Sequence, residues 1–284
     1  MADEKREADD AYDREDYEVA FKKYLPLAER GNAEAQYDIG RMYLAGLWVE
    51  ENNEEGLKWI MLSAEQGDSH AQHFIGLSYM LGNNGLDKNY EESIKWERKA
   101  AEQGHAGSQS DLGLYYRFGM GVDQDYEEAV QWYKKSAEQG NADAQFSYGE
   151  MLDEGLGIKQ DKLEALKYYV DAASQDHDEG NYYCGLAYSL GDAIPQDHKK
   201  AIHFYEKAAL LGNKDAQFAL GIIYEEGAGT TQDYVQAHKW LNISAANEND
   251  EAVEARDSVA EKMSSDQVAK AQDLAREWLE NQEE

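Results

Sequence analysis

Two histidines, His70 and His73, are the side chains in this sequence whose spacing most resembles a pair of metal ligands. They stand three residues apart, which on a helix places both imidazoles on one face. No Cys, Asp or Glu follows either histidine at the fourth position. We therefore interpret the pair as solvated or groove-lining and expect no metal site. His198 and His203 are five residues apart, a poor spacing for two ligands on one helix.

Other patterns associated with catalysis also favour structural interpretations. Pairs such as Gly119 and Gly121 follow predicted helices and recur along the chain, whereas the nucleotide-binding GxGxxG follows a strand and opens a helix. We interpret them as turns. Residues 121–129 lack the twelve-residue calcium pattern, so Asp123 and Asp125 are expected to be turn and cap residues. The Ser-x-x-Lys motif of acyl-enzymes does not occur. Among 58 acidic residues, pairs of carboxylates are too common to indicate glycosidase chemistry. We expect no catalytic residue, no cofactor and no enzyme activity.

A repeat determines which elements position all of these residues. A glycine recurs at steps of 36, 37, 36, 36 and 36 residues, at Gly40, Gly76, Gly113, Gly149, Gly185 and Gly221. Apolar periodicity predicts two helices per unit, residues 33–46 and 54–67 in the first. A glycine inside a helix costs about 0.5–1 kcal/mol relative to alanine, so we expect close helix–helix contact at this register. Cys184 stands at an otherwise apolar register, which predicts a buried, unreactive thiol.

The two ends of the array depart from the repeat. Residues 16–31 align without gaps on residues 125–140, which indicates an opening half-repeat after a short acidic helix. Residues 249–281 abandon the motif and predict two amphipathic helices, the second starting near Ser265. Its Leu274, Trp278 and Leu279 are expected to cover the last repeat. The predicted organisation is a cap and half-repeat over residues 1–31, six repeats over 32–248, and a two-helix cap over 249–284.

The unit A-x-A-Q-x-x-L/I-G-x-x-Y-x-x-G, followed by a GxG loop and A-x-x-W-Y-x-K-A-A-E-Q-G, resembles the Sel-one-like repeat family, a relative of the tetratricopeptide repeats. Residues 126–140, 141–149 and 213–229 match best, and the resemblance covers roughly residues 16–248. It implies an all-α fold, a right-handed superhelical α/α solenoid of helical hairpins. The fifth unit departs most, because Gly180 and Asn181 replace the usual alanine and glutamine. We expect it to be the least ideal hairpin.

The resemblance also implies a function as a non-catalytic scaffold or adaptor that binds a partner protein or peptide along a concave groove. Carried over from tetratricopeptide arrays, the groove positions are Tyr37, His73, Ser110, Phe146, Tyr182 and Phe218, then Arg41, Leu77, Leu114, Glu150, Leu186 and Ile222, and finally Arg117, Asp153 and Glu225. Aromatic side chains at four of the first six would anchor a partner. They would equally serve to pack neighbouring hairpins. The alternative functions are a structural component of a bacterial envelope or secretion assembly, and an enzyme or enzyme inhibitor.

The charge of the chain narrows the class of partner. With 27 basic and 58 acidic residues the net charge is −31, which repels phosphate and excludes nucleic acid as a main partner. A basic or neutral protein is favoured, although the charge would also keep an elongated array soluble. No run approaches the about 18 apolar residues of a membrane span. We expect a monomer, cytoplasmic because no signal peptide follows Met1, or periplasmic or secreted if Met1 replaces a removed signal.

Overall fold

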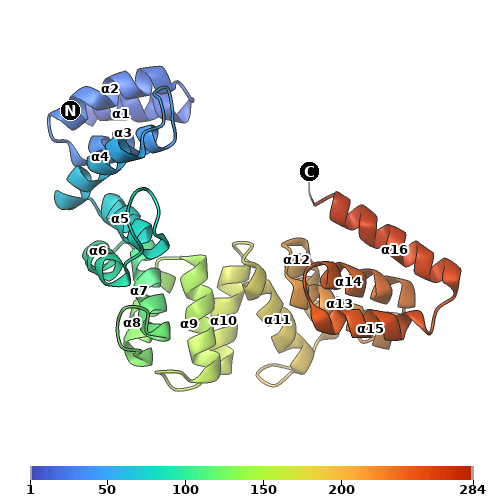
Figure 1. The fold of residues 1–284 in the computed structure, drawn as a ribbon. Helices are drawn as coiled ribbons and strands as arrows, with labels where there is room; N and C mark the ends of the chain where they lie inside the picture. Colours follow the sequence, from blue (N-terminus) through green and yellow to red (C-terminus); the bar gives the residue numbers. More distant parts are fainter. Residues whose placement is uncertain (1, 283–284) are drawn as a thin grey trace. The chain divides into compact units, whose positions relative to one another are not determined.

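The computed structural model describes residues 2–282, and within them the chain forms helices joined by short loops, without strands (Figure 1). The helices are α1 (Ala2–Asp13), α2 (Tyr17–Glu29), α3 (Ala33–Leu44), α4 (Asn53–Glu65), α5 (Ser69–Leu81), α6 (Tyr90–Glu102), α7 (Ala106–Phe118), α8 (Tyr126–Ala137), α9 (Ala142–Glu154), α10 (Lys162–Ala173), α11 (Asp178–Leu190), α12 (His198–Leu210), α13 (Lys214–Glu226), α14 (Tyr234–Ala246), α15 (Asp250–Ala260) and α16 (Ser265–Glu280). The predicted all-α repeat fold is confirmed. Met1 and residues 283–284, the extreme ends of the predicted caps, lie outside the described residues.

The chain divides into two compact units, which are described separately below. The first unit contains α1–α8 and the second contains α9–α16. In each unit consecutive helices pack as antiparallel hairpins, α3 with α4, α5 with α6 and α7 with α8 in the first, and α9 with α10, α11 with α12 and α13 with α14 in the second (Figure 1).

The recurring helix glycine allows close contact inside each hairpin, as predicted. A β-carbon added at Gly113 would lie 2.5 Å from the ring of Tyr133, and one added at Gly185 would lie 2.6 Å from the ring of Tyr205. Real β-carbons do not approach other atoms so closely, so the aromatic ring of the second helix occupies the space that a larger residue would take. The glycine is therefore a packing requirement of the hairpin.

Side-chain caps fix where the second helices begin. Asp125 accepts a hydrogen bond from the backbone N–H of Glu128, and Asp161 accepts one from Glu164, both at 3.0 Å. These bonds satisfy backbone donors that have no partner within the helix. The prediction that Asp125 is a cap residue is confirmed, and Asp161 caps α10 in the same way.

A pair of buried amide hydrogen bonds joins successive helices. The side-chain Nε2 of Gln36 donates to the carbonyl of Ala28 at 3.0 Å, and its Oε1 accepts from Nε2 of Gln66 at 2.5 Å. Equivalent bonds occur at Gln72 and Gln109 in the first unit and at Gln217 in the second. Each glutamine thus connects the preceding helix to the following one through a buried polar contact.

The fifth repeat, α11 with α12, lacks this arrangement. The shorter Asn181 donates to the carbonyl of His177 at 2.9 Å and reaches that of Ala173 only at 3.5 Å. Its Oδ1 is buried without a hydrogen bond, because Leu211 stands where the other repeats have a glutamine or asparagine side chain as donor. A buried acceptor without a partner is destabilising, in line with the expectation that this hairpin is the least ideal.

The last helix, α16, packs on the final repeat of the second unit. The rings of Trp240 and Trp278 meet edge to face with centroids 5.8 Å apart, and Leu279 joins the same apolar cluster. Cys184 is completely buried inside α11, and burial raises the pKa of its thiol to about 12. A thiol with that pKa is protonated at neutral pH, which confirms that Cys184 is an apolar core residue.

Candidate functional site

The residues predicted to line a groove all lie on the first helices of the hairpins. In the first unit these are Tyr37, Arg41, His73, Leu77, Ser110, Leu114 and Arg117. In the second unit they are Phe146, Glu150, Asp153, Tyr182, Leu186, Phe218, Ile222 and Glu225. Arg41 is exposed and all the others are half-buried, so each has part of its surface available and part packed.

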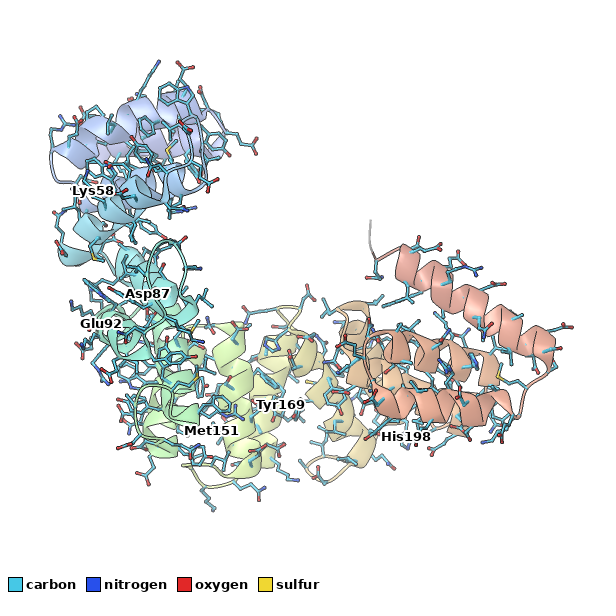
Figure 2. All side chains as sticks on the ribbon, viewed as in Figure 1. Lys58, Asp87, Glu92, Met151, Tyr169 and His198 are labelled. Carbon is cyan, nitrogen blue, oxygen red and sulfur yellow. The ribbon has the colours of Figure 1, made fainter. Side chains whose placement is uncertain are left out.

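Four of the residues predicted in the second unit line one hollow of about 610 Å³. Tyr182 and Leu186 come from α11, and Phe218 and Ile222 come from α13. Tyr205 on α12 and residues 248–251, around the start of α15, complete the wall. His198, at the start of α12 and labelled in Figure 2, also lines the hollow. The hollow therefore combines an aromatic and aliphatic floor with the loop that follows the last repeat.

Carboxylates dominate the rim of this hollow. The acidic side chains are those of Asp215, Glu226, Glu248, Asp250 and Glu251. The one lysine among the lining residues, Lys214, donates from Nζ to the backbone carbonyl of Glu248 at 3.0 Å. Burial and the nearby Asp215 carboxylate both raise the pKa of Tyr182, so its hydroxyl stays neutral at physiological pH. These five acidic residues are exposed, whereas the four apolar residues are half-buried, so we describe the acids as the rim of the hollow and the apolar side chains as its floor.

The remaining predicted residues of the second unit do not line the hollow. Phe146 packs in an aromatic group with Tyr169, His177 and Tyr183 at centroid distances of 5.8, 5.0 and 5.4 Å (Tyr169 is labelled in Figure 2). Here the aromatic side chain packs neighbouring helices, which is the alternative interpretation of this register.

Two acidic residues of that set lie elsewhere. Glu225 accepts a hydrogen bond from Nζ of Lys262 at 2.6 Å. Asp153 lies with Lys162 and Tyr169 at a separate small hollow of about 60 Å³. The acidic positions are therefore engaged in contacts within the unit.

The first unit has a charged hollow of about 400 Å³ at its predicted groove positions. Tyr37 lies against the Arg41 guanidinium, whose carbon is 5.6 Å from the ring centroid. Lys5 on α1 forms an ion pair with Asp38 at 2.9 Å. Burial raises the pKa of Asp38, and the Lys5 ammonium only partly offsets that rise. The Lys5–Asp38 pair and the Arg41–Tyr37 contact therefore engage charged groups of this hollow inside the unit.

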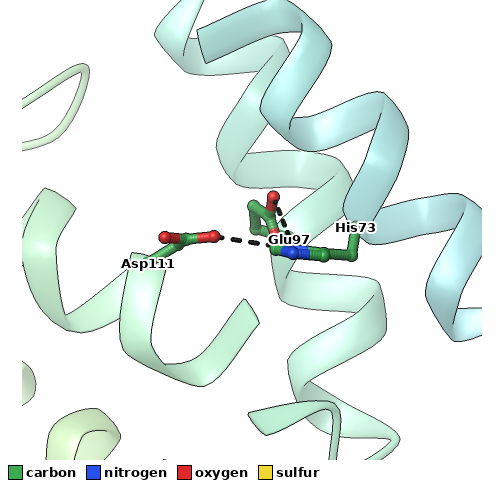
Figure 3. A group of neighbouring side chains, drawn as sticks. All are labelled: His73, Glu97 and Asp111. Atoms are coloured by element: carbon green, nitrogen blue, oxygen red, sulfur yellow. Dashed lines mark hydrogen bonds and ion pairs between the residues drawn. The ribbon is translucent and has the colours of Figure 1, made fainter. Parts of the chain in front are cut away.

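His73 lies in a second charged group of the first unit, apart from this hollow (Figure 3). Its Nδ1 is 3.0 Å from Oε2 of Glu97 on α6 and 3.5 Å from Oδ2 of Asp111 on α7. Burial alone would lower the pKa of His73, but the hydrogen bond with Glu97 and the charges of Glu97 and Asp111 outweigh it and raise the pKa. His70 is exposed and is not part of this group. The charged group therefore forms between side chains of different helices, and the three-residue spacing of His70 and His73 does not produce it.

A family comparison matches most of the chain. The Sel1 repeat model matches residues 33–68, 69–105, 106–141, 142–177, 178–213 and 214–249, which are the hairpins from α3 to α14 with their connecting loops. The chain belongs to the Sel1 repeat family. Sel1 repeat proteins generally serve as scaffolds for protein interactions. A search of curated proteins found no match.

Solved structures of Sel1 repeat proteins share the fold. One is c5321, described as a protective antigen present in uropathogenic Escherichia coli strains, with 30% identity and a TM-score of 0.79 over 93% of this chain and 56% of that one. This chain thus spans about half the length of c5321. Another is a Sel1 repeat protein from Oxalobacter formigenes, with 34% identity and a TM-score of 0.75 over 85% of this chain and 98% of that one. Among the described residues of this Sel1 repeat protein, no helix combines the length and apolar character needed to cross a membrane.

Sequence reasoning missed Glu97 and Asp111. Glu97 occupies a register that apolar or aromatic residues fill in every other Sel1 repeat of this chain, namely Ile60, Tyr133, Tyr169, Tyr205 and Leu241. A carboxylate at such a position is the signal that could have identified the group. Spacing along a single helix does not reveal the group, because its side chains come from three helices.

Proposed function

We propose that this protein is a non-catalytic scaffold that binds a basic or neutral segment of a partner protein in the hollow of the second unit. The observation that carries the proposal is the apolar floor of Tyr182, Leu186, Phe218 and Ile222 beneath a rim of carboxylates. Aromatic and aliphatic anchors surrounded by polar groups are typical of sites that bind peptide segments. The scaffold role of the family supports the same function.

The size of the hollow suits a short segment. About 610 Å³ lies within the range of about 300–1,000 Å³ that holds a ligand or a few peptide side chains. Apolar side chains of the partner would displace water from the floor, which supplies affinity in proportion to the apolar area buried. A whole folded domain would contact mainly the rim.

The rim favours lysine or arginine in the bound segment. Five carboxylates border the hollow, and the whole chain carries a net charge of −31. Such a field accelerates association with a positively charged partner and weakens as salt concentration increases. We therefore propose an occupant that combines apolar anchors with flanking basic residues.

A single chain is sufficient for this function. The residues of the hollow lie on α11, α12 and α13, in the loop that follows α13, and at positions 248–251, so no second copy is needed, and we propose that the protein acts as a monomer. The floor offers aromatic rings and aliphatic chains, which bind by contact area. We infer that binding, without a chemical step, is its activity.

Site-specific photocrosslinking tests this proposal. A photoreactive amino acid replaces Ile222 in the full chain, and mass spectrometry identifies the crosslinked peptide in native lysate. We expect peptides with apolar residues next to Lys or Arg, and a yield that falls as salt is added. Matched photoreactive replacement of Leu163, an exposed apolar residue on α10 outside the hollow, is the control. Equal yields of the same peptides from both positions would contradict the proposal.

Charge reversal on the rim gives a second test. The triple variant Asp215→Lys, Glu226→Lys and Glu251→Lys should abolish capture of the crosslinked partner peptide. A control with the same charge change, Asp171→Lys, Glu206→Lys and Glu254→Lys, alters exposed acids of the same unit away from the hollow and should retain capture. If both triples reduce binding equally, only the total charge matters and the hollow is not the site.

A further inference from the structure

The three helices α5, α6 and α7 bring one imidazole and two carboxylates together. His73, Glu97 and Asp111 each have one ligand atom within 4.8 Å of the others (Figure 3). The side chain of Glu97 is completely buried, and the side chains of His73 and Asp111 are about one fifth exposed, at 22% and 21%. One side of the group is therefore sealed in the core while the other remains accessible from solvent.

Two of the three distances within this group are close to those between the ligands of a small metal ion. Zn–N and Zn–O bonds of about 2.0–2.2 Å in a tetrahedron separate neighbouring ligand atoms by about 3.3–3.6 Å. Nδ1 of His73 is 3.0 Å from Oε2 of Glu97 and 3.5 Å from Oδ2 of Asp111. The ligand oxygens of Glu97 and Asp111 lie within 4.8 Å of each other, so drawing these two carboxylates together would place all three atoms around one ion. Water would complete the fourth position on the accessible side.

The packing around His73 fixes its ring. A β-carbon at Gly107, in the first turn of α7, would lie 3.2 Å from Nε2 of His73, so the backbone of α7 packs closely against the imidazole and a larger residue would press on the ring. Ser108 directs its Oγ to Nδ1 of His73 at 3.2 Å. Rigid elements and locked side chains of this kind are what hold metal ligands in place.

Charge also favours a cation at this position. Two carboxylates face one imidazole, and a fully buried carboxylate such as that of Glu97 is costly unless it is compensated. A divalent ion would neutralise both carboxylates while the imidazole stays neutral. The mixture of one nitrogen and two oxygen ligands suits zinc, whereas calcium and magnesium prefer oxygen alone.

We propose that His73, Glu97 and Asp111 bind one Zn²⁺ ion that holds α5, α6 and α7 together. His73 binds through Nδ1, so Nε2 carries the ring proton. This site is separate from the hollow of the second unit, and its outcome does not depend on the proposed partner binding. It also differs from the pairing of His70 with His73 that the sequence suggested.

Two other histidines, His105 and His177, do not form part of the site. Nδ1 of His105 accepts a hydrogen bond from the backbone N–H of Ser108 at 3.1 Å, so it caps α7 and is not free to bind the ion. In the second unit His177, Asp178 and Glu179 also lie close together. They are successive residues at a helix start, and Nδ1 of His177 accepts from the N–H of Gly180 at 3.1 Å. We expect no metal there.

Cobalt titration of the full chain tests the proposal. The protein is freed of metal with a chelator and titrated with Co²⁺ in excess Mg²⁺, which occupies weak sites among the 58 acidic residues. We expect saturation at one Co²⁺ per chain, with the intense visible bands of four-coordinate cobalt, and displacement by Zn²⁺. Absence of these bands from the wild-type protein, or only the weak spectrum of hydrated Co²⁺, would overturn the proposal.

Variants locate the bound ion. Asp111→Asn and His73→Gln, on different helices, should each weaken Co²⁺ binding by at least about 100-fold, since even outer partners of a metal site commonly contribute about 10–100-fold. His70→Gln, on the same helix as His73 and outside the group, should leave affinity unchanged. Zn²⁺ should raise the melting temperature of the wild type and of His70→Gln but not of the other two. If all three variants keep the bands, the ion binds adventitiously elsewhere.

Discussion

The same two positions of the repeat carry an ion pair in one unit and an aromatic pair in the other. His73 and Glu97 occupy them in α5 and α6, with Nδ1 and Oε2 3.0 Å apart. Phe146 and Tyr169 occupy them in α9 and α10, with ring centroids 5.8 Å apart. Tyr182 and Tyr205 do so in α11 and α12, also at 5.8 Å.

The comparison shows that the fold does not require a polar residue at either of these two positions. An aromatic pair gains from burial and needs no further partner, whereas a buried carboxylate needs a compensating charge. The repeat therefore folds with rings at these positions, and the charged pair is a departure from the pattern. Departures of this kind are expected where a protein has a function beyond its fold.

The largest loss of stability is expected from removing one of the paired aromatic rings, that of Tyr205. Tyr205→Ala should lower the free energy of unfolding by about 3–5 kcal/mol, because the ring is almost completely buried and leaves a cavity. Urea unfolding measures the total loss. Hydrogen exchange should show reduced protection in α11–α14 and unchanged protection in α3–α6, as expected for a repeat array.

The control for this prediction is Tyr234→Ala, at a half-buried tyrosine of α14 in the same unit. It should cost clearly less, since less of the ring is removed from water. An equal loss of protection in α3–α6 and α11–α14 would show that the two units do not unfold separately.

Converting the ion pair into the aromatic pair should have an intermediate effect. Glu97→Tyr alone should destabilise the metal-free protein by about 1–3 kcal/mol, because His73 loses its buried partner. Adding His73→Phe should recover most of this loss, since replacing a whole buried ion pair by apolar groups is often neutral or stabilising. A double-mutant cycle in urea measures the coupling energy between residues 73 and 97. Strictly additive effects of the two substitutions would contradict this prediction.

Restoring the amide pairing in the fifth repeat should give a smaller gain. Asn181→Gln combined with Leu211→Gln should stabilise the protein by about 1 kcal/mol, because the buried acceptor of residue 181 gains a donor. Leu211 is 45% exposed, so replacing it sacrifices little apolar burial. Urea unfolding should show Leu211→Gln alone to be less effective, and equal effects would argue against the predicted bond.

The smallest expected effect is a change of stability with pH, caused by the titration of His177, which caps α11. Burial alone would lower its pKa, but a hydrogen bond to Asp143 and the Glu179 carboxylate outweigh burial and raise it above the ordinary value of 6.5. A raised pKa in the folded state stabilises the protein fully below pH 6.5, and this stabilisation is lost as pH rises through the raised value. Because Asp143 is 81% exposed, the change should be below about 1 kcal/mol.

His177→Asn tests this directly. Asparagine caps the equivalent helices at Asn32 and Asn213, so the variant keeps a cap and removes the titrating group. Between about pH 6 and about pH 8 the wild type should lose slightly more stability than the variant. A loss in the opposite direction would show that the cap, which needs the neutral ring, outweighs the ion pair.

The sequence predicted the elements of this fold well because its signals are local and repeated. Apolar periodicity and the cap at Asp125 act within a few residues, and the glycine that recurs every 36 or 37 residues marks the six copies that reinforce them. The burial of Cys184 was predictable because the same register holds apolar or aromatic residues in the other repeats. These inferences needed no knowledge of how the helices meet.

The candidate sites depend on side chains from different helices, and there the sequence was less informative. Aromatic residues at one register line a hollow at Tyr182 and Phe218 but pack between helices at Phe146. The difference depends on neighbouring side chains and on the loop at residues 248–251. Glu97 could have been noticed by register, but its distance from His73 follows only from the packing of α5 on α6.

The buried amides have a consequence for how such a protein changes in length. Gln36, Gln72 and Gln109 each donate to a carbonyl eight residues earlier and accept from an amide 30 or 31 residues later. One copy of the motif is thus bonded to its neighbours as another copy would be. A gene duplication or deletion that adds or removes one whole copy recreates the same junction, whereas a change of half a copy would leave buried amides unpaired. Evolution of this chain by unequal recombination is therefore constrained to whole steps of the repeat.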